Sequence, residues 1–293
     1  MHASAIRALL LTTLVSAVSA NAEGLSAKIW NEKNRGHVQV TGSAPQFPDG
    51  TQLRVEVLVK GNFAEPIVGA FFRVRVKGGQ FSQEEKRPNV FAPLTYTIKL
   101  KLQVSGQIPQ VRKILEQKFG WPQQHIQDLD FTDVQLGTEE ESAEFRLGTL
   151  RRLRTLTEEL YGVHETLEPA IDTPVAENPA WEATKVEFVR KSRALGGKIR
   201  RFNSEYAALP DDDLVKALGK SLNKLSTISQ DMEKGVNAQN LRRDIGRVRQ
   251  WIDTLHADVN GRLPVSERNQ RPLLVPKNDG DDGDEEDVEE DGK

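Results

Sequence analysis

The period of the apolar residues changes near residue 138 of this 293-residue chain, and that change constrains the fold more than any other feature. Up to about residue 138, apolar residues recur at every second position, the period of a β-strand with one buried face. From 139 to 262 they recur in steps of three and four, the period of an amphipathic helix. The sequence therefore predicts an α+β multidomain protein, with a β domain over 23–138 and helices over 139–262.

The β domain contains several runs in which apolar residues alternate with charged ones. Turn signals separate the runs at Pro48-Asp49-Gly50 and Gly78-Gly79. One-sided strands with short connections are typical of an antiparallel sheet with a solvated face, and several of them suggest a β-sandwich. His37 is expected on the outward side of its strand, without a partner. The apolar positions are Val38 and Val40, then Leu53, Val55, Val57 and Val59, then Phe72, Val74 and Val76, then Tyr96, Ile98, Leu100 and Leu102.

The turn motifs resemble those of a known kind of module. Residues 47–51 (FPDGT) precede an alternating strand, and residues 79–81 and 92–94 precede the strand over 95–104. This arrangement resembles the immunoglobulin-like β-sandwich modules of exported bacterial proteins, over about 80 residues. The resemblance implies a scaffold or adhesion element, and it carries over no catalytic residue because its motifs specify turns.

A short helix interrupts the β pattern near 108–120. Gly120 and Pro122 end it, and a short strand with Phe131, Val134 and Leu136 is expected to follow. We interpret this helix as an insertion that covers one end of the sandwich. Alternatively, it lines a ligand groove together with Trp121 and His125. Its apolar positions are Val111, Ile114, Leu115 and Phe119.

The helical region carries four apolar stripes with short connections, except where Pro169, Pro174 and Pro179 interrupt the chain. Such a pattern predicts an antiparallel four-helix bundle. The alternative is a pair of helical hairpins that dimerise through exposed seams. The stripes run from Leu150 to Leu167, from Trp181 to Leu209, from Leu214 to Met232, and from Leu241 to Val259.

Residues 1–22 have the order of a cleavable signal peptide: Arg7, an apolar run over 8–18, and a small-residue site at Ala20-Asn21-Ala22. The run is shorter than the roughly 20 residues that cross a membrane. We therefore expect cleavage near Ala22, no membrane span, and a periplasmic or extracellular protein. The chain has no cysteine, which excludes disulfides and thiolate sites.

Residues 263–293 are predicted to be a disordered acidic tail. Residues 279–293 hold ten acidic side chains and one lysine, a net charge of −9 in a chain whose net charge is −3. Like charges with little apolar content resist folding. An EF-hand register fails because Gly280 falls at a ligand position and no helices flank the loop. Weak binding of divalent cations by the tail is compatible with its charge, and so is a salt-sensitive contact between the tail and the basic stripes of the helices.

Few residues suggest chemistry. His125, Asp128 and Asp130 follow no established metal-ligand spacing. His164 and Glu165 would need Asp253 or Asp258 beside them to act as an acid–base pair, and nothing in the sequence brings these together. Arginine-rich clusters on the first, second and fourth helices are interspersed with acids, as on an ordinary solvated surface. The alternative is that these basic stripes bind a polyanion such as an anionic surface polymer.

The sequence therefore favours an exported, non-catalytic interaction or scaffold protein with no cofactor. The partner would be an unknown protein or an envelope polymer, and not a nucleic acid. The alternative is a small-ligand or polysaccharide-binding protein that uses a groove near Trp121. A third hypothesis is an enzyme without a recognisable motif.

Overall fold

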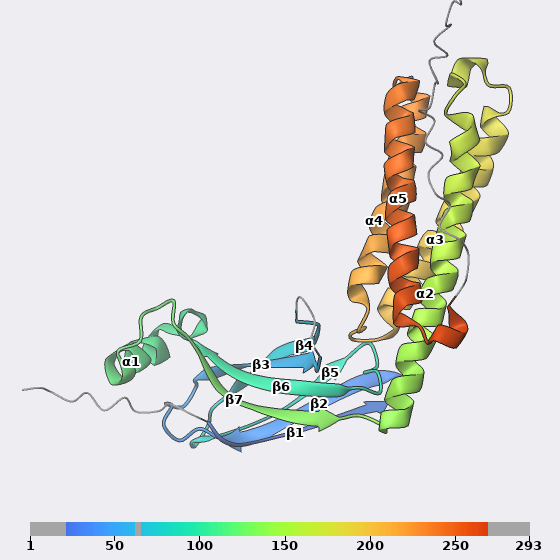
Figure 1. Cartoon of the computed structure of the whole chain (residues 1–293). Helices are drawn as coiled ribbons and strands as arrows, with labels where there is room; N and C mark the ends of the chain where they lie inside the picture. Colours follow the sequence, from blue (N-terminus) through green and yellow to red (C-terminus); the bar gives the residue numbers. More distant parts are fainter. Residues whose placement is uncertain (1–21, 62–65, 269–293) are drawn as a thin grey trace, which may run out of the picture.

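The computed structural model describes residues 22–61 and 66–268, in which β-strands precede four long helices (Figure 1). The chain is therefore α+β, as predicted. Its strands are β1 (Glu23–Glu32), β2 (Arg35–Ser43), β3 (Gln52–Val59), β4 (Val68–Arg75), β5 (Gln80–Arg87), β6 (Thr95–Gln103) and β7 (Ile126–Gln135).

The strands form two antiparallel sheets, one in the order β1-β2-β5 and the other in the order β4-β3-β6-β7. The alternating apolar positions of both sheets contribute to one core, because each strand turns every second side chain inward. Val38 and Val40 enter it from the first sheet, and Val55 and Leu100 from the second. Tyr96 is fully buried there and its hydroxyl donates to the carbonyl of Ala92 (3.0 Å).

Two strands, β1 and β5, are absent from the sequence prediction. Along β5 only Phe81 is buried, so this edge strand lacks the apolar alternation. Its place is instead set by hydrogen bonding to β2. His37 lies on the side of β2 opposite Val38 and Val40, as predicted, but the prediction that it has no partner was wrong. This side chain is buried, stacks on Trp30 and bonds to Glu84 (2.9 Å), because strands flank β2 on both sides.

The helix expected near 108–120 is α1 (Pro109–Phe119). Proline occupies its first turn, and Gly120 ends it in the left-handed conformation (φ 68°), which glycine adopts without strain. Val111 and Leu115 bury its inner face in the β core. The strand that follows, β7, is longer than expected and turns Phe131 outward.

Four long helices follow: α2 (Glu139–Leu167), α3 (Trp181–Glu205), α4 (Asp212–Glu233) and α5 (Ala238–Arg262). Thr138 and Glu141 form a capping box at the start of α2, which satisfies backbone groups that the helix leaves unpaired. The side chain of Asn237 caps α5, because it accepts a hydrogen bond from the backbone amide of Gln239 (2.7 Å). Asp212 and Asp213 lie in the first turn of α4, where the helix dipole favours negative charge.

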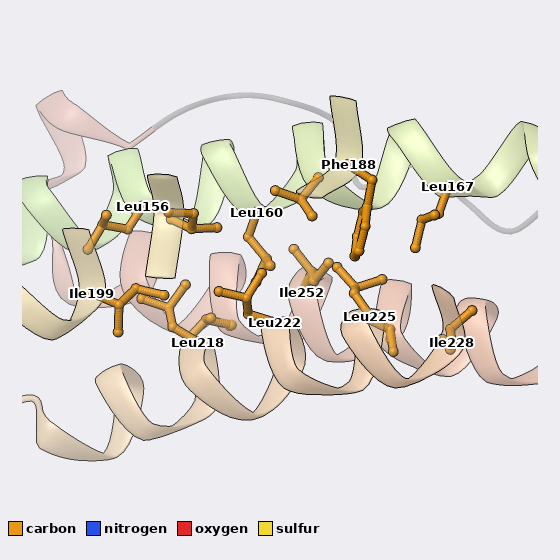
Figure 2. Close-up of a cluster of buried hydrophobic side chains, with 14 of the residues drawn as sticks. Leu156, Leu160, Leu167, Phe188, Ile199, Leu218, Leu222, Leu225, Ile228 and Ile252 are labelled. Carbon is orange, nitrogen blue, oxygen red and sulfur yellow. The ribbon is translucent and has the colours of Figure 1, made fainter. Parts of the chain in front are cut away.

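The apolar stripes of the four helices meet in a second core. Helix α2 packs against α3 and α5, and α4 packs against all three others. Figure 2 shows side chains from every helix pointing into this shared interior. The labelled ones are Leu156, Leu160, Leu167, Phe188, Ile199, Leu218, Leu222, Leu225, Ile228 and Ile252.

A packed junction joins the β part to the helices, which stand at one end of the sheets (Figure 1). Val90 forms a parallel bridge with Tyr206, and the amide of Ala207 donates to the carbonyl of Val90 (2.8 Å). Phe145 of α2 lies edge-on to Tyr206, with ring centres 4.8 Å apart. Both aromatic residues contact both cores, so the junction is continuous with each of them.

The two ends of the chain test the prediction only in part. Most of the predicted signal peptide, residues 1–21, and the acidic run after Arg268 lie outside the described residues. Ala22 is buried in the β core. Residues 263–268, assigned to the disordered tail by the prediction, pack against the helices: Leu263 is buried, and Arg151 makes two 2.7 Å bonds to Glu267. Over the described ranges, no helix has the length and hydropathy needed to cross a membrane.

Candidate functional site

The two residues of the predicted ligand groove, Trp121 and His125, lie together beyond the end of α1. Their rings stack with centres 4.7 Å apart, and Trp121 also stacks on Phe119 at 4.5 Å. Phe47 packs against both Phe119 and Trp121. The cluster therefore joins α1 to the sheets. Since Trp121 already stacks on Phe119 and His125, much of its ring face is covered by side chains of the protein itself.

The three residues considered for a metal do not converge. His125 contacts Gln127 (3.3 Å), Asp128 lies 3.6 Å from Lys101, and a carboxylate oxygen of Asp130 accepts from the amide of Leu25 (3.3 Å). Within residues 22–61 and 66–268, no group of three histidine, aspartate or glutamate side chains could hold a metal ion.

His164 is buried and takes a different partner from those considered. Its Nε2 donates to the carbonyl of Ile245 (3.2 Å), and its Nδ1 lies 3.7 Å from Glu168, with no hydrogen-bond partner. Burial lowers the pKa of His164, and this outweighs the opposing attraction of Glu168. Glu165 and Asp253 face Arg249 instead, at 3.9 and 3.4 Å.

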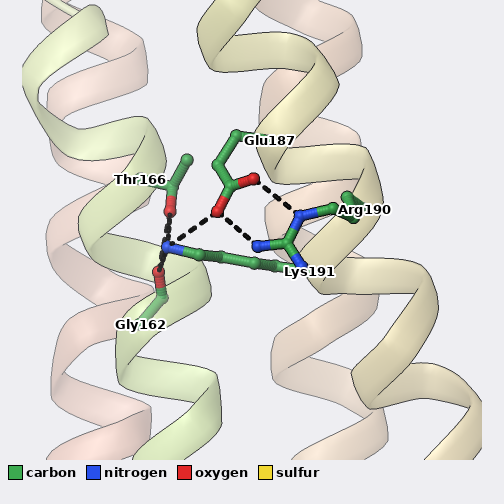
Figure 3. Close-up of polar contacts among 5 residues, drawn as sticks. All are labelled: Gly162, Thr166, Glu187, Arg190 and Lys191. Carbon is green, nitrogen blue, oxygen red and sulfur yellow. Dashed lines mark hydrogen bonds and ion pairs between the residues drawn. The ribbon is translucent and has the colours of Figure 1, made fainter.

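Most of the arginine-rich clusters are used within the protein. Figure 3 shows Arg190 held by Glu187 through two 2.7 Å bonds, while Lys191 reaches from α3 to Thr166 of α2 (3.0 Å). The Lys191 contact ties α3 to α2, whereas the Arg190–Glu187 pair lies within α3. Likewise, Arg151 and Arg152 pair with Glu267 and Glu205.

An unpartnered surface is found instead on the outward side of the β4-β3-β6-β7 sheet. Strand register places Phe71, Glu56, Lys99 and Phe131 in one row across the four strands. Phe71 is 62% exposed and Phe131 is 68% exposed, both unusual for large aromatic side chains. Adjacent strands lie about 4.8 Å apart, so three steps separate the two rings by about 14 Å.

We call this surface the open face. A second row, of Arg73, Arg54, Lys101 and Asp128, runs beside the first. Glu56 lies 2.9 Å from Arg54 and 3.1 Å from Lys101, and the Arg54 guanidinium lies 5.4 Å from the Phe71 ring centre. The open face consists of Arg54, Glu56, Phe71, Arg73, Arg75, Lys99, Lys101, Asp128 and Phe131.

The open face has an excess of positive charge, with five cationic side chains and two carboxylates. Arg73, Arg75 and Lys99 make no hydrogen bond or ion pair with any residue that the structure describes. At its margin, the Lys60 ammonium and the Thr97 hydroxyl hold the pKa of Asp133 below its ordinary value, so this acid stays ionised and paired. Unpaired cations beside exposed rings can attract an anion, and the rings then offer it a flat apolar surface.

Sequence reasoning missed this site, although part of its signal was present. The alternation over 72–77 already placed Arg73 and Arg75 on the outward side. By the same period Phe71 is outward, but nothing local connects it to Phe131, which lies 60 residues later. A bulge near Asp128 also changes which residues of β7 face out.

Comparison with known proteins found no relative: no family model matches the chain, and no curated protein and no solved structure matches it.

Proposed function

We propose that this chain is an exported, non-catalytic interaction protein of the cell envelope or exterior, and that its open face binds an anionic polymer. The single observation that carries the binding proposal is the pair of exposed phenylalanines in one row, with the unpaired Lys99 between them and the unpaired Arg73 and Arg75 beside them on β4. The proposed export rests on the pattern of residues 1–22, with cleavage near Ala22. The absence of catalysis is inferred from the sequence, which contains no catalytic motif.

The proposal includes a finer view of the fold. We infer that the two sheets form an immunoglobulin-like sandwich, and that α2 to α5 form an antiparallel four-helix bundle. The single core that both sheets share supports the first inference. The contacts of α2 with α3 and α5, and of α4 with its neighbours, support the second.

Binding would combine long-range attraction with short-range contact. The cations of the open face would raise the local concentration of a polyanion, an effect that salt screens over about 8–10 Å. Phe71 and Phe131 would then contact the apolar faces of two units of the polymer. An envelope polysaccharide that carries carboxylate, sulfate or phosphate groups has both features.

The test is binding of a sulfated dextran, with uncharged dextran as the comparison polymer, measured by calorimetry on the full chain. Removing two cations with Arg73→Ala and Arg75→Ala should weaken binding by about 2- to 30-fold, if each exposed charge contributes about 0.2–1 kcal/mol. Phe71→Ala combined with Phe131→Ala should also weaken it. The matched control is Arg201→Ala with Arg247→Ala, which changes the net charge equally and leaves the open face intact.

Equal losses in the control and the open-face variants would reduce the proposal to non-specific charge attraction. A loss on Trp121→Ala, with full binding by the open-face variants, would place the ligand in the predicted groove of Trp121 and His125. Binding of uncharged dextran as tight as that of the sulfated polymer would contradict the role of the cations.

A further inference from the structure

A second unpartnered basic feature lies on the helices, in a groove between α3 and α4. The groove has a volume of about 510 Å³. Arg193 and Arg200 line it from α3, and Asn223, Ser226 and Gln230 line it from α4. Apolar side chains also line the groove, as does Glu233, which pairs with Lys185, so its free donors are mainly the two arginines and the polar side chains of α4.

The two arginines differ from most of their basic neighbours in having no acidic partner. Lys198, between them in sequence, pairs with Glu159 at 2.6 Å, and Arg190 pairs with Glu187. Neither Arg193 nor Arg200 forms a hydrogen bond or ion pair with a described residue. Seven residues separate them, which places them on one side of α3 about 10 Å apart along the helix axis.

Ser192 is a further polar residue of the groove. Its hydroxyl lies among the groove's lining residues, is buried, and has no hydrogen-bond partner among the described residues. Buried hydroxyls in folded proteins are nearly always paired, because leaving one unpaired costs about 1–3 kcal/mol. Because this hydroxyl is itself buried, the exposed guanidinium groups of Arg193 and Arg200 are the groups that a ligand with acceptor atoms would contact.

The chain itself contains a segment with the matching chemistry. Residues 279–291 include ten carboxylates, and acids three positions apart recur within them, as at Asp284 and Asp287. In the polyproline II conformation common in unstructured chains, side chains three residues apart share a face and lie about 9 Å apart. That spacing is close to the separation of Arg193 and Arg200.

The segment is long enough to reach the groove. The described chain ends at Arg268, beside the first half of α2, where Arg151 holds Glu267. Ten residues, 269–278, precede the acidic run, and fully extended they span at most about 35 Å. Passing two helices, each about 10–12 Å across, requires about 25 Å. The pairing of Lys198 with Glu159 and of Arg152 with Glu205 places Arg200 level with the stretch of α2 between Arg152 and Glu159, one to two helical turns beyond Arg151.

We propose that the acidic segment 279–291 docks in the α3–α4 groove of its own chain, with its carboxylates on Arg193 and Arg200. The contact gives the tail a defined binding site on the helices, and this site is separate from the open face. High ionic strength releases the segment, because both arginines are exposed and their attraction is screened.

The test is a distance measurement between two spin labels on the full chain. The protein has no cysteine, so Thr227→Cys on α4 and Glu286→Cys in the tail supply the only two thiols. A docked segment gives a narrow distance distribution in low salt, which broadens in 1 M salt. An undocked segment gives a broad distribution in both, since the 18 residues from Arg268 to Glu286 then span about 25 Å on average.

Replacing Arg193 and Arg200 by alanine should convert the narrow distribution into the broad one, and Arg201→Ala with Arg247→Ala should leave it narrow. Dilution with unlabelled protein should not change the narrow distribution, because the contact is within one chain. A distribution that is broad in low salt, or that the groove variants do not alter, would overturn the proposal. So would a narrow distance from Glu286→Cys to a label at Thr97→Cys beside the open face.

Discussion

Replacing Leu225 with aspartate should unfold the helical part of this protein. Leu225 lies in the middle of α4, is fully buried, and points into the interior shared by the four helices (Figure 2). Shortening such a leucine to alanine costs about 2–5 kcal/mol, from lost apolar contact and from the cavity that remains. Aspartate adds the cost of burying a carboxyl group without a partner, which is several kcal/mol more.

The sum is comparable with the whole stability of a domain, which is about 5–15 kcal/mol. Leu225→Asp should therefore abolish the cooperative melting of the helices. Leu225→Ala should leave a folded protein whose Tm is lower by about 4–20 °C, since 1 kcal/mol corresponds to about 2–4 °C in a protein of this size.

The assay is thermal unfolding followed by far-ultraviolet circular dichroism at 222 nm. Thr227→Asp is the matched control, because it places the same charge on the exposed side of the same helix. It should change stability by less than about 0.5 kcal/mol. A Leu225→Asp protein that melts cooperatively within 2 °C of the parent would refute the placement of Leu225 in the core.

Three further predictions concern a cap, a buried histidine and the junction. Thr138→Ala removes the capping box of α2 and should cost about 1 kcal/mol in urea unfolding, whereas no loss would show that the cap is not needed. Burial lowers the pKa of His164, so below about pH 6.5 the unfolded chain takes up a proton at this residue and the folded chain does not. The free energy of unfolding should therefore fall on acidification, by up to about 1.4 kcal/mol per pH unit. His164→Gln should flatten that slope in urea melts at pH 7 and pH 5, and an unchanged slope would assign the dependence to other groups. Tyr206→Ala removes the aromatic contact with Phe145 and should make the sheets and helices melt at separate temperatures in calorimetry, while a single retained transition would show that they unfold as one unit without it.

The sequence alone was sufficient to locate the helices and most of the strands. Each apolar stripe from Leu150 to Val259 falls within an observed helix or just beyond its end, because a helical period is set by residues three and four apart in the chain. The inward side chains of β3 and β6 were also predicted, because alternation along a strand is likewise set by neighbouring residues in the chain. Edge strand β5 escaped prediction because its place depends on hydrogen bonds to β2 and hardly on its own apolar residues.

Both proposed binding surfaces depend on the tertiary structure. Phe71 and Phe131 share a row only because strands distant in the sequence pair in a particular register. Arg190 and Arg193 are three residues apart and look equivalent in the sequence, yet one is held by Glu187 and the other lines a groove. Composition and period are local properties of the sequence, and they are the same in the folded and the unfolded chain. The partners of a charged side chain and the exposure of an aromatic ring depend instead on which distant segments pack beside them.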